Sequence, residues 1–314
     1  MTEETFTWGQ ADCGISVLAP KSGATNGSCI LYLHGGGLLY GQRDDLPAAY
    51  RDLLTGAGYT LVCADYPLAP ETALPEIHRC LDALWDWFTG TLMPKLGTST
   101  AFLFGRSSGA YLALTLAGRL TQTPDALVPC GVIDLYGYGS LSDGFFGTPS
   151  LHYRSFPLVG EPTVRGLVLD SQPTCGPKTT RYALYVYARQ TGSWLTMLGI
   201  GDDDIERLSL SDEQIAAMPP VFYAASTGDN DVPYAVSKAL ARRLGAQTKT
   251  VYGLDHDFDR DSSNPACLEV YQTCLRWMNE LIGEVHAQRC YAERYLNAER
   301  AQEPHRCHGP PTRT

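Results

Sequence analysis

The sequence predicts an α/β fold with a mostly parallel central sheet, helices on both of its faces and a small cap insertion. Short, continuously apolar runs recur along the chain, which is typical of strands buried on both faces of a parallel sheet. Amphipathic segments of helix length separate these runs, as expected for βαβ units. Residues 138–217 interrupt the alternation and are therefore interpreted as an insertion between two strands.

Six apolar runs are predicted to be strands. They lie at residues 28–33, 59–64, 100–104, 130–135, 221–225 and 249–252. Helices are predicted at residues 46–57, 75–88, 108–120 and 233–244, with a final long helix from 265 towards 286. In the second of these helices, Pro75 stands where proline is favoured at a helix start. Ile77, Leu81 and Leu84 then recur at the three-to-four spacing of one apolar face.

The chain is predicted to be a single domain over residues 1–314 that contains the insertion at 138–217. This insertion is rich in glycine, proline, serine and aromatic residues, and residues 181–198 within it have helical character. We therefore expect a partly helical cap, whose aromatic side chains either line a substrate pocket or form the core of the cap. Residues 299–314 are polar and are expected to be a flexible tail.

Composition excludes several classes of protein. With 44% hydrophobic and 18% charged residues the chain is too apolar to be mainly disordered, and its net charge of −10 disfavours nucleic-acid and anionic membrane partners. No apolar run is long enough for a membrane span and no basic leader is visible, so a cytoplasmic location is expected. The ten cysteines show no CxxC pair and are interpreted as reduced thiols. No cofactor or metal is expected, because neither residues 202–204 nor His305 and His308 belong to a spaced ligand set.

The segment Gly105-Arg-Ser-Ser-Gly109 matches the pattern G-x-S-x-G. It lies between a predicted strand and a predicted helix, which is the context of a nucleophile elbow. Such a tight turn lifts the serine hydroxyl above the sheet at a helix N-terminus, so Ser107 is the candidate nucleophile. The alternative is a glycine- and serine-rich helix start without chemistry.

The segment His34-Gly-Gly-Gly37 directly follows the first predicted strand. Consecutive glycines can aim backbone N–H groups at one point, as a tetrahedral oxyanion requires, so Gly36, Gly37 and Ser108 are the candidate oxyanion donors. The alternative is a turn that only permits close packing. His34 is interpreted as a residue that positions this loop.

A serine nucleophile needs a histidine base and a carboxylate, here in the chain order Ser, Asp, His. His256 lies just after the last predicted strand, whereas the other histidines lie on helices, in the glycine loop, in the insertion or in the tail. The preceding strand leads into a loop that holds Asp229 and Asp231. Asp229 is preferred because it is closer to the strand end, while Asp231 stands near a helix start where it could act as a cap.

Together these segments resemble the α/β-hydrolase superfamily, and more narrowly the hormone-sensitive-lipase-like esterases with an HGGG motif (the α/β-hydrolase fold-3 family). The stretch from Asp65 to Glu71, D-Y-P-L-A-P-E, is similar to the D-Y-R-L-A-P-E segment of that family. The resemblance implies hydrolysis of short acyl or acetyl esters, with Ser107, Asp229 and His256 as the triad.

The chain also departs from the family pattern. Family members usually have G-D-S-A-G-G at the elbow, but here Arg106 replaces the acid and Ser108 the alanine. Arg106 is expected to be a surface or ion-paired arginine. The N-terminal cap of many relatives is reduced to about 27 residues, which leaves the insertion as the expected lid.

Two other functions stay open at this stage. The leaving group could be an amide, formamide or peptide nitrogen in place of an ester oxygen, because the same triad and oxyanion donors can act on either bond. The fold could also serve as a ligand-binding receptor, although all three triad residue types are present. A small-molecule ester is the expected partner, and the oligomeric state, a homodimer included, is left open.

Overall fold

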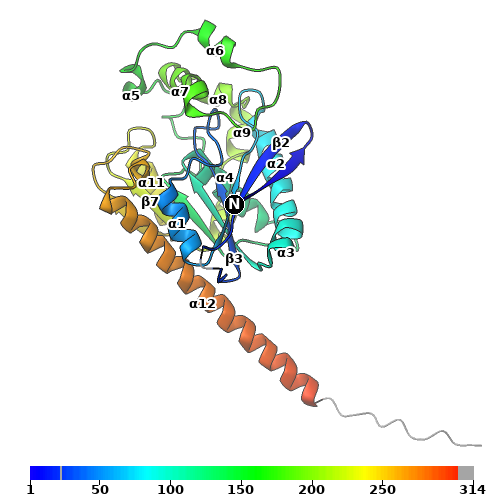
Figure 1. Ribbon diagram of the computed structural model, residues 1–314. Coiled ribbons are helices and arrows are strands. Elements are labelled where there is room, and N and C mark those ends of the chain that lie inside the picture. The colour runs from blue at the N-terminus through cyan, green and yellow to red at the C-terminus, as the bar shows by residue number, and fades with distance from the viewer. Residues whose placement is uncertain (22, 303–314) are drawn as a thin grey trace, which may run out of the picture.

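An eight-stranded sheet forms the centre of the molecule in the computed structural model, which describes residues 1–21 and 23–302 (Figure 1). Side chains are described up to residue 285 and at Ala287. The strands are β1 Thr2–Trp8, β2 Ala11–Leu18, β3 Ser28–Leu33, β4 Thr60–Ala64, β5 Thr100–Arg106, β6 Gly131–Leu135, β7 Val221–Ser226 and β8 Gln247–Val251. Their order is β1-β2-β4-β3-β5-β6-β7-β8, with β1, β2 and β4 antiparallel and all pairs from β4 to β8 parallel.

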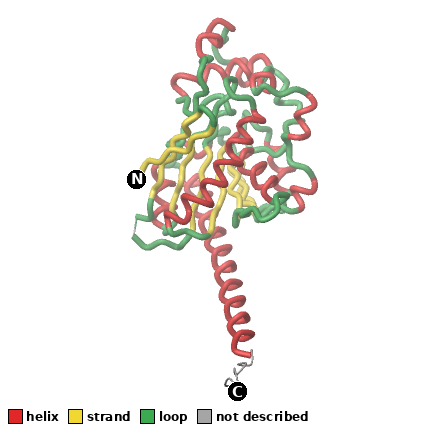
Figure 2. The backbone as a smooth tube through the Cα atoms, turned by 90° about the vertical axis from the view of Figure 1, so that its right-hand side faces the viewer, coloured by secondary structure: helices red, strands yellow, loops and turns green. Residues whose placement is uncertain are grey.

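Helices lie on both faces of this sheet (Figure 2), and a hydrophobic cluster fills the space under each layer of helices. One lies beneath α1 (Ala48–Gly56) and the first turns of α12 (Pro265–Gln302). The other lies beneath α2 (Leu74–Trp87), α4 (Ser108–Leu120) and α11 (Tyr234–Arg243). Every residue of β3 to β7 is buried, which explains why these strands are apolar without alternation. A π-helix, η1 (Phe88–Leu92), and α3 (Met93–Leu96) continue α2, and a 3-10 turn, η2 (Phe258–Arg260), precedes α12.

The insertion between β6 and β7 folds into short helices above the sheet, in the upper part of Figure 1. These are α5 Leu151–Arg154, α6 Glu161–Leu167, α7 Lys178–Thr191, α8 Trp194–Met197, α9 Asp202–Arg207 and α10 Asp212–Ala216. A buried ion pair ties the longest of them to the body, because Arg181 on α7 contacts Glu71 at 2.7 Å. The acidic residues 202–204 form the first turn of α9, where negative charge complements the helix dipole.

The structure differs from the sequence-based expectation at both ends of the chain. Strands β1 and β2 were not predicted. Most side chains of β1, at the sheet edge, face solvent, and in β2 Asp12 and Gly14 interrupt the apolar run. Strand β8 begins at Gln247, two residues before the predicted start, since this edge strand is also largely polar. Helix α12 continues to Gln302, so residues 299–302 of the expected tail are helical, while 303–314, with His305 and His308, lie outside the described residues.

The sequence predicts no membrane-spanning segment and reduced cysteines. No helix within the described residues is both long enough and apolar enough to span a membrane. The eight cysteines whose side chains are described form no disulfide, and six of them are buried.

Candidate active site

Ser107 lies on the turn between β5 and α4 with φ 54° and ψ −122°, a backbone conformation that is rare outside glycine. A Cβ atom at Gly105 would lie 2.2 Å from the carbonyl carbon of Gly109, and one at Gly109 would lie 2.2 Å from the carbonyl oxygen of Leu33. The turn therefore requires both glycines of the motif. The Ser107 N–H donates to the carbonyl of Leu135 at 2.8 Å, which fixes the turn against the next strand.

The structure brings His256 between Ser107 and Asp229. His256 Nε2 lies 2.8 Å from Ser107 Oγ, and its Nδ1 lies 2.8 Å from Asp229 Oδ2. The other carboxylate oxygen of Asp229 accepts the backbone N–H groups of Asp231 and Val232, both at 2.8 Å. The Asp229 side chain is 1% exposed, so the carboxylate is held by hydrogen bonds in place of water.

The pKa of His256 reflects two opposing effects. Burial favours the neutral imidazole, but the carboxylate of Asp229, with smaller contributions from Asp231 and Asp257, outweighs it and raises the pKa to about 9. The site thus stabilises an imidazolium, the species that forms when this histidine accepts a proton.

Asp231, the alternative acid, contacts the cap and makes no contact with His256 among the described hydrogen bonds. Its Oδ2 accepts from Tyr185 at 2.7 Å and from Tyr153 at 3.0 Å, and Arg189 Nε donates to Oδ1 at 3.2 Å. All three donors belong to cap helices α5 and α7. Asp231 therefore joins the cap to the loop that carries Asp229.

The glycine loop after β3 lies beside the elbow. Gly36 and Gly37 have positive φ values of 112° and 60°, and within the described chain the N–H groups of Gly36, Gly37 and Ser108 donate no hydrogen bond. The Ser108 hydroxyl accepts the N–H of Leu38 at 3.3 Å and so links elbow to loop. His34 is fully buried, and its ring stacks on Tyr66 with centroids 4.2 Å apart, as a residue that positions the loop would.

The cap also holds this loop. The Trp194 indole donates to the carbonyl oxygen of Gly37 at 2.9 Å, and the Tyr185 ring lies so close that a Cβ on Gly37 would be 2.1 Å from its Cε2. The insertion is therefore part of the wall of the site.

Arg106 lies behind the nucleophile with its side chain 2% exposed. Its guanidinium contacts Asp259 at 2.7 Å and Asp45 at 3.3 Å, and its Nε donates to Tyr136 at 2.8 Å. Asp259 also accepts from the hydroxyls of Tyr136 at 2.7 Å and Tyr271 at 2.5 Å. Arg106 was expected to be either a surface residue or an ion-paired residue. In the structure it is buried and ion-paired.

A cavity of about 290 Å³ opens onto Ser107. Glycines, tyrosines and polar or charged residues line it: Gly36, Gly37, Tyr40, Ser107, His152, Tyr153, Lys178, Tyr182, Tyr185, Asn230, Asp231, Asp255, His256, Asp257 and Arg260. Three of the tyrosines, Tyr153, Tyr182 and Tyr185, come from the aromatic-rich insertion, whereas Tyr40 follows the glycine loop and was not predicted. Lys178 and Arg260 gave no sequence signal, because isolated basic residues beside a turn look like ordinary surface residues.

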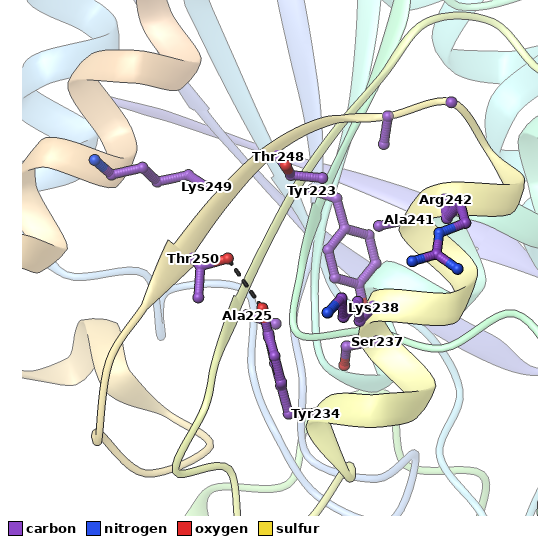
Figure 3. Close-up of a pocket in the computed structure, with 12 residues that line it drawn as sticks. Tyr223, Ala225, Tyr234, Ser237, Lys238, Ala241, Arg242, Thr248, Lys249 and Thr250 are labelled. Atoms are coloured by element: carbon purple, nitrogen blue, oxygen red, sulfur yellow. Dashed lines mark hydrogen bonds between the residues drawn. The ribbon is translucent and has the colours of Figure 1, made fainter.

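A larger cavity of about 510 Å³ lies elsewhere, between α11 and the edge strand β8 (Figure 3). Thr248 and Thr250 border it from the strand, and Ser237, Lys238 and Arg242 from the helix, whereas Lys249 points away and pairs with Glu269 of α12 at 2.6 Å. No residue of the predicted site lines this cavity, so its size does not make it the candidate active site.

Comparison with known proteins agrees with this geometry. A family model described as alpha/beta hydrolase fold matches residues 30–258. The chain belongs to the α/β hydrolase fold family. Among solved structures, an alpha/beta hydrolase superfamily protein from Enterococcus faecalis is 28% identical, with a TM-score of 0.77 over 89% of this chain and 99% of that one. The carboxylesterase EstE1 from a metagenomic library is 18% identical, with a TM-score of 0.64 over 90% of this chain and 88% of that one, a likeness of fold alone.

Curated relatives match over shorter segments. An esterase from Acinetobacter venetianus is 34% identical over 122 residues, which is 39% of each chain. A non-reducing polyketide synthase from Penicillium roqueforti is 32% identical over 172 residues, 49% of this chain and 7% of the synthase. The chain thus spans less than half the length of these relatives.

Proposed function

We propose that the protein is a serine carboxylester hydrolase. The observation that carries this proposal is the continuous chain of hydrogen bonds from Ser107 through His256 to Asp229, with both contacts at 2.8 Å. This chain of contacts supports Ser107 as nucleophile, His256 as base and Asp229 as orienting acid, because acyl transfer requires these groups in this relation. The similarity to an esterase from Acinetobacter venetianus, together with the family match, supports ester hydrolysis in general.

The proposed reaction has two halves. Ser107 Oγ attacks the ester carbonyl carbon while His256 Nε2 takes the hydroxyl proton, and the N–H groups of Gly36, Gly37 and Ser108 stabilise the oxyanion. The carbon–oxygen bond to the alcohol then breaks, and His256 returns the proton to the leaving oxygen. Water repeats both steps on the acyl-enzyme, with the Ser107 oxygen as the leaving group. Asp229 keeps the imidazole in the tautomer that can accept at Nε2.

The acyl group is proposed to be short. The cavity at Ser107 is about 290 Å³, at the lower end of the roughly 300–1,000 Å³ of small-ligand sites. Tyr185 borders it beside Gly37, and the Trp194 indole holds the carbonyl oxygen of Gly37 in place.

The test is hydrolysis of p-nitrophenyl esters from acetate to decanoate by the wild type and Ser107→Ala. We expect turnover that falls with chain length in the wild type and is lost in the variant. Turnover that the variant retains would contradict the role of Ser107. If no ester is hydrolysed, the same comparison on aryl amides and formamides decides whether the leaving atom is nitrogen.

A further inference from the structure

The cavity at Ser107 has an unusual lining for an esterase of hydrocarbon substrates. None of its fifteen lining residues is Ala, Val, Leu, Ile, Met or Pro, and four of them are tyrosines: Tyr40, Tyr153, Tyr182 and Tyr185. Small-molecule sites are usually lined mainly by apolar side chains. A saturated acyl chain would therefore leave charged and polar groups desolvated without partners, which costs free energy.

Most of the charges in this cavity are already satisfied by the protein. Asp231 is bonded to Tyr153, Tyr185 and Arg189. Asp255, which is exposed, accepts from the Asn230 amide at 2.7 Å. These groups have hydrogen-bond partners before any substrate binds.

Lys178 and Arg260 differ, because they share one carboxylate. Arg260 Nε is bonded to Asp257 Oδ2, and Lys178 Nζ lies 4.0 Å from the same oxygen. Among the described residues, the Lys178 ammonium has no hydrogen-bond acceptor, and it lies over the Tyr182 ring at 4.6 Å from the centroid. Two cations thus converge on the single carboxylate of Asp257, while the other two carboxylates that line the cavity are bonded to other groups.

The local structure adds to this positive potential. Lys178 is the first residue of α7, where the helix dipole is positive and a cation is unfavourable. No side chain caps the N-terminus of this helix, and its first turn contains no acidic residue. Partial burial and the neighbouring Arg260 lower the pKa of Lys178, although Asp257 opposes them. A lysine placed against local preference in this way is a mark of a functional site.

We propose that Lys178 and Arg260 form an anion subsite at the rim of the cavity, and that the preferred substrates are short esters that carry a carboxylate. This inference rests on the proposed function for the reaction, since it names the substrate class of the same site. The subsite and Ser107 line one cavity of about 290 Å³, so a chain of only a few carbons separates the ester from the carboxylate. Monoesters of succinate and glutarate have this form.

The experiment compares matched esters that differ in one charge: p-nitrophenyl hemisuccinate with p-nitrophenyl butyrate, and p-nitrophenyl hemiglutarate with p-nitrophenyl valerate. We expect kcat/KM to be roughly tenfold higher for the carboxylate-bearing member, through a lower KM. The preference should decrease between 20 mM and 500 mM salt, because ions screen an exposed charge pair. Equal or higher kcat/KM for the neutral esters would overturn the proposal.

Variants locate the effect. Lys178→Gln is expected to abolish most of the preference, because the charged contact with the carboxylate is lost. Arg260→Gln should also reduce the preference, since it removes one cation and frees Asp257 to pair with Lys178. The matched control is Lys238→Gln, which removes an exposed lysine from the separate cavity beside β8. A preference that survives Lys178→Gln, or that Lys238→Gln removes equally, would contradict the assignment.

A binding measurement separates this proposal from the proposed function. Monomethyl succinate is titrated into Ser107→Ala, and into Ser107→Ala with Lys178→Gln, by calorimetry or ligand-observed NMR. Binding that requires Lys178 would support the subsite even if no ester is hydrolysed. Ester hydrolysis by the wild type without such binding would retain the esterase and refute the subsite.

Discussion

At the scale of single residues, two aspartates in one loop have different tasks. Asp229 contacts His256 at 2.8 Å, whereas Asp231 is bonded to cap residues. We expect Asp229→Asn to lower kcat by roughly 10³–10⁴-fold, because an amide no longer selects the required tautomer of the imidazole. Asp231→Asn should lower kcat far less but should reduce the melting temperature, since it leaves the buried Arg189 without a charge partner. Steady-state kinetics and thermal unfolding of both variants check this, and equal losses of kcat would contradict it.

The pKa of His256 leads to a second prediction. Below about pH 9 the imidazole is protonated and cannot accept the Ser107 proton, so kcat/KM should rise as the pH increases towards 9. Asp231 is one of the carboxylates that raise this pKa, and Asp231→Asn should therefore move the acid limb to lower pH. The pH profile of kcat/KM for both proteins is the measurement. An acid limb below pH 7 in the wild type would mean that solvent screens the carboxylates around His256.

A residue of this site could be predicted from the sequence where its position requires a special backbone conformation. Ser107, Gly36 and Gly37 lie on turns that only glycine-rich patterns permit, so their positions are visible in the sequence. The choice between Asp229 and Asp231 required the position of Tyr185 on the cap, which no local pattern encodes. Lys178 and Arg260 both contact Asp257 because α7 of the insertion lies close to this residue, and no local pattern encodes that contact.

At the scale of elements, the Arg106 network joins β5 to the turn that follows His256. Asp259 is fully buried, so Arg106→Met would leave its carboxylate without a charge partner and should destabilise the protein by roughly 3–5 kcal/mol. The double variant Arg106→Met with Asp259→Leu should be considerably less destabilised than the two single changes added together. Urea unfolding of the three variants gives the coupling free energy. Additive losses would show that the pair does not hold the two elements together.

The same scale shows why some elements were predicted and others were not. Strands β3 to β7 are buried on both faces, and burial on both faces leaves an apolar run in the sequence. Strands β1 and β8 are the two edges of the sheet, each with few fully buried side chains, and their sequences resemble polar loops. An edge strand forms because its backbone hydrogen-bonds to the neighbouring strand. That pairing cannot be recognised from the sequence of the edge strand alone.

At the scale of the whole molecule, one buried carboxyl makes stability depend on pH. Asp134, at the end of β6, has no exposed surface, and its Oδ2 has no hydrogen-bond partner among the described residues. Burial raises the pKa of Asp134 to about 8, although the Gly137 N–H opposes this. The folded chain therefore keeps this proton up to about pH 8, whereas the unfolded chain loses it above roughly pH 4.

Between these values folding takes up a proton, so this group lowers the free energy of unfolding as the pH rises, by up to about 1.4 kcal/mol per pH unit. Asp134→Asn has nearly the same shape and does not titrate. Its stability relative to the wild type should therefore increase steadily from pH 5 to pH 8 and level off above. Urea unfolding at several pH values measures this difference, with the exposed Asp86→Asn as the control that should show no such trend. Because any lost packing or hydrogen bond in Asp134→Asn is the same at every pH, the slope alone reports the buried proton, and parallel stability curves would show that Asp134 is ionised in the folded protein.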